Sequence, residues 1–210
     1  MHTGVFGPTN GAISDRYPTP IVGAGYAYAI WGPIFLLDVV YGTWQCLNRR
    51  ADAALRRIRP LTAAMGFALT SLWMMAFSRQ EFWLALAIIG GSLACLLFAA
   101  WHVARTARHA RGRRWQWVPL SLHAGWISLA VFLNAAQVIV AFRLLPVAHM
   151  LPWTLVLFIL AALLVLSAVV RMSGNPWYVL AVVWGLVGYR PWLAPMSRRG
   201  WHWFLLVQWQ

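Results

Sequence analysis

One apolar stretch of the sequence, residues 117–142, carries polar side chains at helical spacing. Steps of three and four residues separate the members of this stripe: His123, Trp126, Ala130, Asn134 and Gln137. Such spacing puts them on one face of a helix. Hydrocarbon disfavours polar groups, so this face should meet protein or a cavity. As a cavity wall, Asn134 and Gln137 would bond the polar edge of a ligand, and His123 would donate a hydrogen bond or bind the metal of a tetrapyrrole. The alternative is interhelical hydrogen bonding, at about 0.6 kcal/mol per contact.

Asp38 is the one acidic residue inside an apolar stretch, residues 22–46. A charged side chain at this depth costs about 2.5–3.5 kcal/mol on insertion scales, so Asp38 is a candidate functional residue. Its partner would be His123 or an arginine at a helix end. The alternative is a protonated or water-exposed carboxyl group near the middle of the helix.

Three tryptophans, Trp31, Trp73 and Trp126, lie deep in three different apolar stretches. At 1.5 Å per residue they are about 15, 20 and 15 Å from the ends of their stretches. Tryptophans that anchor a helix at the interface lie near its ends, so this depth indicates another role. We expect the three rings to surround one cavity for a flat ligand, which opens toward the outer half of the bilayer and is covered by the segment before Pro20. Ordinary packing is the alternative.

The composition indicates a membrane protein. Of 210 residues, 61% are hydrophobic and 10% are charged, against about 45–50% and 25% in soluble domains. Six apolar stretches follow one another, at residues 22–46, 61–77, 82–104, 117–142, 151–170 and 177–189. In hydrocarbon they must be helices, because every backbone polar group needs an internal partner. The sequence therefore predicts an all-α polytopic transmembrane bundle with five to six spans, the sixth being short. It excludes a soluble enzyme and a secreted disulfide scaffold.

The basic residues predict an orientation for this bundle. All 17 are arginines, and the net charge is +13. Before the first stretch and in the next four connections they number one, five, one, five and one. This alternation follows the positive-inside rule, with the N-terminus outside and both Arg-rich loops in the cytoplasm. Because those loops adjoin helix ends, orientation and lipid headgroups explain the charge better than nucleic acid does. We expect membrane lipids as partners and no nucleic acid.

Residues outside the stretches predict how the chain is divided. Residues 1–20 are expected to be an extracytoplasmic segment, residues 21–193 the helical bundle, and residues 194–210 an aromatic tail in the interface. Between the fifth and sixth stretches, Gly174 suits the end of one helix, while Asn175 and Pro176 suit the cap and first position of the next. A tight hairpin should join these helices.

Three motifs occur in order on successive stretches. Residues 24–35 read Ala-Gly-Tyr-Ala-Tyr-Ala-Ile-Trp-Gly-Pro-Ile-Phe, and residues 68–73 read Ala-Leu-Thr-Ser-Leu-Trp. Residues 119–134 follow the pattern Pro-x6-Trp-x3-Ala-x2-Leu-Asn. Together they resemble the tryptophan-rich sensory protein family, the bacterial relatives of the mitochondrial translocator protein, in its longer six-helix branch. Leu69 or Thr70 stands at the place of the second motif's Asn.

The resemblance implies a translocator-protein-like core that binds porphyrins and, in some members, sterols. We expect a multi-pass protein of the bacterial inner membrane that binds a flat hydrophobic ligand, tetrapyrrole-like or isoprenoid-like, in a Trp-lined pocket, with a sensing or carrier role. The candidate ligand-binding residues are Trp31, Asp38, Trp73, His123, Trp126, Asn134 and Gln137.

Other functions remain open at this point. The main alternative is a non-catalytic accessory subunit of a larger membrane complex, such as a pigment-binding photosynthetic one. A weaker alternative is an enzyme that modifies a lipid or a porphyrin. The sequence has no Cys-x-x-Cys, no His-Glu-x-x-His and no phosphate loop. We therefore expect no catalytic residues and no metal site, with a tetrapyrrole as the candidate ligand. A homodimer and a larger membrane complex are both compatible with the composition.

Overall fold

The computed structural model describes residues 3–4, 7–8, 10–14, 16–17, 19–21, 23, 25–47, 60–106, 114–146 and 150–188. The predictions made for most of the two Arg-rich loops (residues 48–59 and 107–113) and for the aromatic tail (residues 194–210) lie outside the described residues.

The described chain is a bundle of helices, as predicted. Its helices are α1 (Asn10–Ser14), the 3₁₀ helix η1 (Gly25–Ile30), α2 (Trp31–Leu47), α4 (Pro60–Ser78), α5 (Phe82–Thr106), α6 (Arg114–Ala141), α7 (Met150–Arg171) and α8 (Pro176–Gly188). Near the N-terminus, the short strands β1 (Thr3–Gly4) and β2 (Gly7–Pro8) pair antiparallel. Four helices, α4, α5, α6 and α7, are long and apolar enough to cross a membrane. With 17 and 13 residues, α2 and α8 are shorter.

The first apolar stretch differs from its prediction, because it is divided into η1 and α2 at Trp31. Pro33 explains the division. It has no N–H to donate to the carbonyl group of Ala29, so an α-helix that ran through this point from further upstream would lose a hydrogen bond and be destabilised. In the first turn of α2 the missing donor costs nothing, since N–H groups there have no intrahelical acceptor. Trp31 consequently lies at the junction of η1 and α2.

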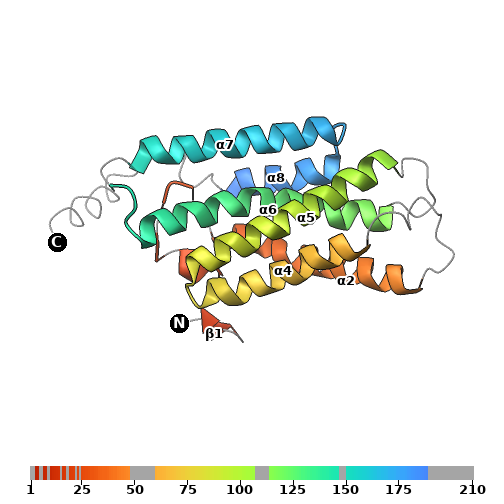
Figure 1. The fold of residues 1–210 in the computed structure, drawn as a ribbon, viewed down its shortest axis with the longest axis horizontal. Coiled ribbons are helices and arrows are strands. Elements are labelled where there is room, and N and C mark those ends of the chain that lie inside the picture. Colours follow the sequence, from red (N-terminus) through yellow and green to blue (C-terminus); the bar gives the residue numbers. More distant parts are fainter. Residues whose placement is uncertain are drawn as a thin grey trace.

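Helix α6 occupies the centre of the bundle (Figure 1), between α7 and α8 on one side and α4 and α2 on the other. In its membrane-length part 56% of residues are buried, against 33% in α4 and α5 and 22% in α7. A helix that is surrounded by others can carry polar residues at depth without exposing them to lipid. The polar stripe predicted from the sequence therefore lies on the most enclosed helix.

The helix ends that bound the two Arg-rich loops lie at the same end of the bundle (Figure 1), where α2 and α5 end and α4 and α6 begin. The turn between α7 and α8 lies at this end as well. The up-and-down order of the helices thus agrees with the alternation of the arginines. The side of the membrane that this end faces stays a prediction.

The hairpin between α7 and α8 has the predicted turn chemistry. Gly174 has a φ of 72°, and its N–H donates to the carbonyl of Val169 at 2.9 Å. Asn175 caps α8 by accepting the N–H of Trp177 at 3.2 Å. Its amide group also donates to Ser121 of α6 at 2.6 Å. Asn175 therefore fixes the start of α8 both to its own first turn and to the central helix.

Small residues bring α8 close to α6. A Cβ atom added at Gly125 would lie 2.6 Å from the carbonyl oxygen of Tyr178 and 3.0 Å from the Cβ of Ala181. The hydroxyl of Tyr178 donates to Ser128 at 2.8 Å. On its other side, α8 reaches η1, because Trp184 donates its indole N–H to the carbonyl of Ala27 at 2.9 Å.

Candidate functional site

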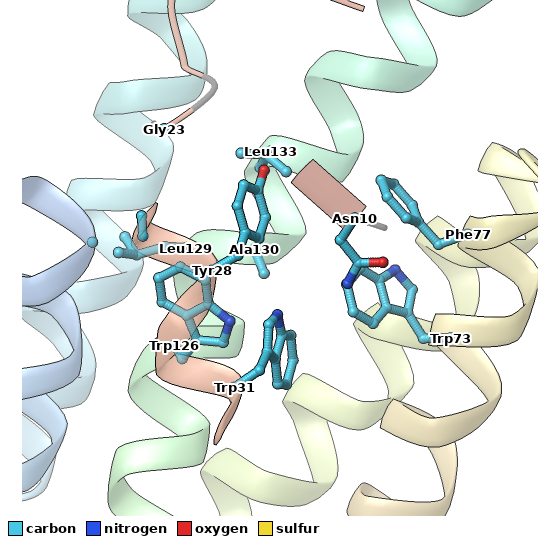
Figure 2. A pocket seen from close by; sticks show the side chains of 12 residues that line it. Asn10, Gly23, Tyr28, Trp31, Trp73, Phe77, Trp126, Leu129, Ala130 and Leu133 are labelled. Atoms are coloured by element: carbon cyan, nitrogen blue, oxygen red, sulfur yellow. The ribbon is translucent and has the colours of Figure 1, made fainter. Parts of the chain in front are cut away.

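Trp31, Trp73 and Trp126 come from α2, α4 and α6 and meet in the interior (Figure 2). We call these three rings the aromatic layer. The centroid of Trp31 lies 5.6 Å from that of Trp73 and 6.1 Å from that of Trp126. All three side chains are buried. The sequence-based prediction that these rings converge on one cavity is therefore confirmed; their role toward a ligand stays a prediction.

The aromatic layer borders a small cavity that the N-terminal segment covers (Figure 2). The residues around it are Asn10, Gly23, Ala27, Tyr28, Trp31, Trp73, Phe77, Trp126, Leu129, Ala130, Leu133 and Gly185. Its free volume is about 30 Å³, which is room for one or two water molecules. A ring compound would therefore have to separate these side chains in order to bind.

Each ring of the aromatic layer has an unused hydrogen-bond donor. The indole N–H groups of Trp31, Trp73 and Trp126 are buried and have no hydrogen-bond partner among the residues that the structure describes. A buried donor without an acceptor costs about 1–3 kcal/mol. A ligand that presents acceptors to this cavity would remove that cost.

A second set of side chains lies beside the aromatic layer. We call Asp38, Thr70, Ser92 and His123 the polar layer. Asp38 Oδ2 lies 2.9 Å from His123 Nδ1, and His123 Nε2 lies 3.2 Å from Thr70 Oγ1. Thr70 Oγ1 lies 2.7 Å from Ser92 Oγ, and both hydroxyls donate to the carbonyl of Gly66, at 3.0 and 2.9 Å. Of the two kinds of partner predicted for Asp38, the described residues supply His123.

The two layers share three helices. On α2, Asp38 follows Trp31 by seven residues; on α4, Thr70 precedes Trp73 by three; on α6, His123 precedes Trp126 by three. Separations of three and seven residues keep two side chains on one helix face. The ring of Phe67 stacks on His123, with centroids 5.6 Å apart and an interplanar angle of 13°.

Asp38, His123 and Thr70 present a carboxylate, an imidazole and a hydroxyl group in the same order as a hydrolytic triad. In this case the hydroxyl is wholly buried, and Thr70 already donates to Gly66 within its own helix. None of Asp38, Thr70 and His123 borders the cavity. The geometry of the polar layer thus favours a buried network over a nucleophile that meets a substrate.

His123 is not placed as a ligand for the metal of a tetrapyrrole. Its side chain is 1% exposed, and its two ring nitrogens face Asp38 and Thr70. In the described part of the chain, no group of three or more His, Cys, Asp or Glu side chains could hold a metal ion. His123 acts on the cavity only through the rings that contact it.

The remaining two candidates have different surroundings. Gln137 donates to Ser14 Oγ at 2.9 Å, and Ser14 Oγ lies 2.7 Å from the hydroxyl of Tyr28, so Gln137 joins α6 to α1 and η1. Asn134 is fully buried, and in the described part of the chain neither the oxygen nor the nitrogen of its amide group has a partner. Neither residue borders the cavity. Of the two roles considered from the sequence, interhelical hydrogen bonding therefore fits Gln137. It does not fit Asn134 among the described residues.

Comparison with protein families identifies the fold's relatives. The model of the TSPO-like protein family matches residues 2–189, which includes both layers and every predicted site residue. The chain belongs to this family. No curated protein and no solved structure matches it.

In this TSPO-like chain, the site contains residues that sequence reasoning did not select. Thr70 and Ser92 complete the polar layer, Phe67 stacks on His123, and Asn10 and Tyr28 line the cavity. Thr70 could have been found, since it lies three residues before Trp73 in a motif where the resemblance expects Asn. Ser92 and Phe67 give no comparable signal, because their role depends on how the helices are rotated.

A larger cavity of the TSPO-like chain lies between α6, α7 and α8, with a volume of about 270 Å³. Only apolar side chains border it: Ile21, Leu129, Phe132, Phe158, Ala161, Ala162, Val165, Leu166, Val182 and Leu186. Leu129 borders both cavities, and a Cβ atom at the neighbouring Gly185 would overlap it. Leu129 is thus the side chain that separates the two.

Proposed function

We propose that this TSPO-like protein binds a flat hydrophobic ligand at the aromatic layer and acts as a sensor or carrier in the bacterial inner membrane. The observation that carries the proposal is the meeting of Trp31, Trp73 and Trp126 from three helices, each with a free indole donor. Stacking on large rings adds about 0.5–1.5 kcal/mol beyond burial, and a tetrapyrrole offers both a flat face and polar acceptors.

Two features support a ligand larger than the present cavity. The N-terminal segment contributes Asn10 and Gly23 as a cover, so that movement of a short segment would enlarge the cavity. Displacement of Leu129 would join the cavity to the apolar one between α6, α7 and α8. A hydrocarbon or isoprenoid tail would fit the second cavity while the ring occupies the first.

Porphyrin binding to the detergent-purified protein tests this function. Quenching of tryptophan fluorescence gives the affinity of the wild type and of Trp31→Phe, Trp73→Phe and Trp126→Phe. Loss of a donor and of ring area should weaken binding by about 5- to 100-fold in each variant. The matched control is Trp83→Phe, because Trp83 is 53% exposed on α5 and does not border the cavity. Equal affinity in all four variants would contradict the proposal.

An accessory role in a larger membrane complex is the second candidate, and helix α7 favours it. Only 22% of its membrane-length residues are buried, and it exposes large apolar side chains along most of its length. A partner helix or bound pigment could cover this surface as well as lipid can. Purification in mild detergent separates the two: stable co-purification with other subunits supports the accessory role, and a coloured monomer or dimer supports the ligand binder.

A further inference from the structure

We infer that Asp38 and His123 form a proton-binding site linked to the aromatic layer, so that an anionic ring compound binds together with a proton. The inference rests on the proposed function for its ligand and deepens it by naming the ligand's charge. It assigns to the polar layer a role that the cavity residues alone do not suggest.

Counting hydrogens in the polar layer shows where a proton can reside. Thr70 and Ser92 each have one hydroxyl hydrogen, and both donate to the carbonyl of Gly66. Thr70 Oγ1 is then left as an acceptor for His123, 3.2 Å away, so Nε2 carries a hydrogen. On the other side, Nδ1 and Asp38 Oδ2 lie 2.9 Å apart, which is ion-pair distance, although Nδ1 does not meet hydrogen-bond geometry among the described residues. A small rotation of either side chain would let the two atoms share one more proton. With that proton the Asp38–His123 pair has no net charge.

Either change in proton number gives the pair a net charge. A second proton gives an imidazolium beside a neutral carboxyl group, and loss of the shared proton leaves a carboxylate beside a neutral imidazole. Both charged states are unfavourable among apolar helices. The neutral pair therefore persists until a compensating charge comes near it, and the shared proton belongs to the pair and not to either residue alone.

Trp31 would place a bound ligand, and any charge that the ligand carries, close to the Asp38–His123 pair. Its ring meets His123 edge-on, with centroids 6.0 Å apart, while the same ring borders the cavity. A ligand that touches Trp31 is thus separated from the imidazole by a single side chain. An anionic substituent at that position favours the state with the second proton. Carboxylates also accept hydrogen bonds, which the free indole donors of the aromatic layer require.

Of the two residues in the pair, Asp38 lies nearer the surface of the bundle. The side chain of Asp38 is 12% exposed, against 1% for His123. Its second oxygen, Oδ1, is buried and has no hydrogen-bond partner among the described residues, so it is a free acceptor for a second proton. His123 would then receive a proton from the carboxyl group across the 2.9 Å contact and not from solvent.

The surrounding helices supply no competing charge among the described residues. Helix α4 has no titratable side chain. Besides the two arginines named below, those of the other helices packed here are Tyr41 and Cys46 on α2, Cys95 and His102 on α5, Tyr26 and Tyr28 on η1, and Tyr178 on α8. His102 lies in the last turns of α5 and stacks on Phe98. Tyr28 and Tyr178 are held by Ser14 and Ser128. The arginines of α5 and α6, Arg105 and Arg114, stack on Trp101 and Trp115 at the helix ends. In the described part of the chain, His123 makes the one ion-pair contact of Asp38.

The test compares a dicarboxylic porphyrin with its dimethyl ester across about pH 5 to 8. If the dicarboxylic porphyrin binds together with one proton, its affinity for the wild type gains a factor of ten for each unit fall in pH. A protein that lacks the proton site does not gain this factor. His123→Gln keeps hydrogen-bonding groups but does not titrate in this range, and Asp38→Asn keeps the shape of the carboxyl group. Both should lose this extra slope. Tyr41→Phe, a neighbour on α2, is the control and should keep it.

The porphyrin's own carboxyl groups also titrate, but they affect the pH dependence of binding equally for the wild type and for every variant. The difference between two such pH dependences therefore reports on the protein alone. Equal slopes in wild type, His123→Gln and Asp38→Asn would overturn the link while leaving the proposed function intact. The dimethyl ester should show no extra slope in any of them; an extra slope with the ester would contradict the requirement for an anion.

A titration without ligand separates the proton site from the proposed function. Infrared difference spectra of the detergent-purified protein should contain a carboxyl band that changes with pH and is absent in Asp38→Asn. If the wild type binds no porphyrin at any pH, the proposed function fails and the spectra alone decide. A pH-dependent Asp38 band then supports the proton site, and its absence overturns it.

Discussion

The ring of Trp31 stands edge-on to His123, at an interplanar angle of 89°. This pair is the direct contact between the ring that borders the cavity and the imidazole that faces Asp38. A change in the position of either ring is therefore transmitted to the other. In the proposed proton site of this TSPO-like protein, the buried pair would respond to occupancy of the cavity through this contact.

Asn134→Leu should stabilise the ligand-free protein. Both atoms of the buried amide group are without partners, so an apolar side chain of similar size removes a desolvation cost of about 1–3 kcal/mol. Thermal unfolding in detergent should show a higher midpoint. Gln137→Leu is the matched control on the same face; it loses the 2.9 Å bond to Ser14 and should show a lower midpoint. A lower midpoint for Asn134→Leu would show that Asn134 has a partner after all.

Gly125→Ala should destabilise the packing of α8 on α6. The added methyl group would lie 2.6 Å from the carbonyl oxygen of Tyr178, so backbone must move, at about 1–3 kcal/mol. Gly90→Ala is the control, because no atom lies within 4 Å of its added Cβ and alanine favours a helix by about 0.5–1 kcal/mol. Unfolding midpoints should move in opposite directions. A shift of the same sign in both would contradict this account.

Cysteine labelling tests the orientation predicted from the arginines. In a background without Cys46 and Cys95, Arg56→Cys and Arg111→Cys should react with a membrane-impermeant reagent only in inside-out vesicles. Arg143→Cys lies in the connection after α6 and is predicted to face outside. It should react only in cells whose outer membrane has been made permeable while the inner membrane is intact. Reaction of Arg56→Cys or Arg111→Cys from outside would reverse the topology.

The sequence predicted the helices because hydrophobic length is a local property. The stretches at residues 82–104 and 151–170 agree with α5 and α7 to within a few residues. The predicted turn at Gly174 and Asn175 is also correct, since its capping groups are neighbours in the chain. The first stretch was predicted as one helix because the effect of Pro33 on the residues before it was not considered.

Contacts between helices could be predicted only in part. His123 was one of two kinds of partner predicted for Asp38, because few polar groups lie at depth, and the structure places it 2.9 Å away. The convergence of the three tryptophans followed from depth and from family motifs. By contrast, the lack of a described partner for Asn134 and the bond from Gln137 to Ser14 depend on how α6 is rotated relative to α1. The spacing of residues along the sequence does not predict this rotation.

If the cavity binds a ring compound as proposed, its small size, about 30 Å³, would determine the rate of binding. Association must wait for the tryptophans to separate, so the observed rate constant should level off at high ligand concentration instead of rising in proportion to it. The apparent affinity is lowered by the fraction of time that the cavity is open. Once the rings close over the ligand, the same barrier opposes departure and lengthens the residence time. A closed aromatic layer thus suits a molecule that holds scarce ligand for long periods better than one that exchanges it rapidly.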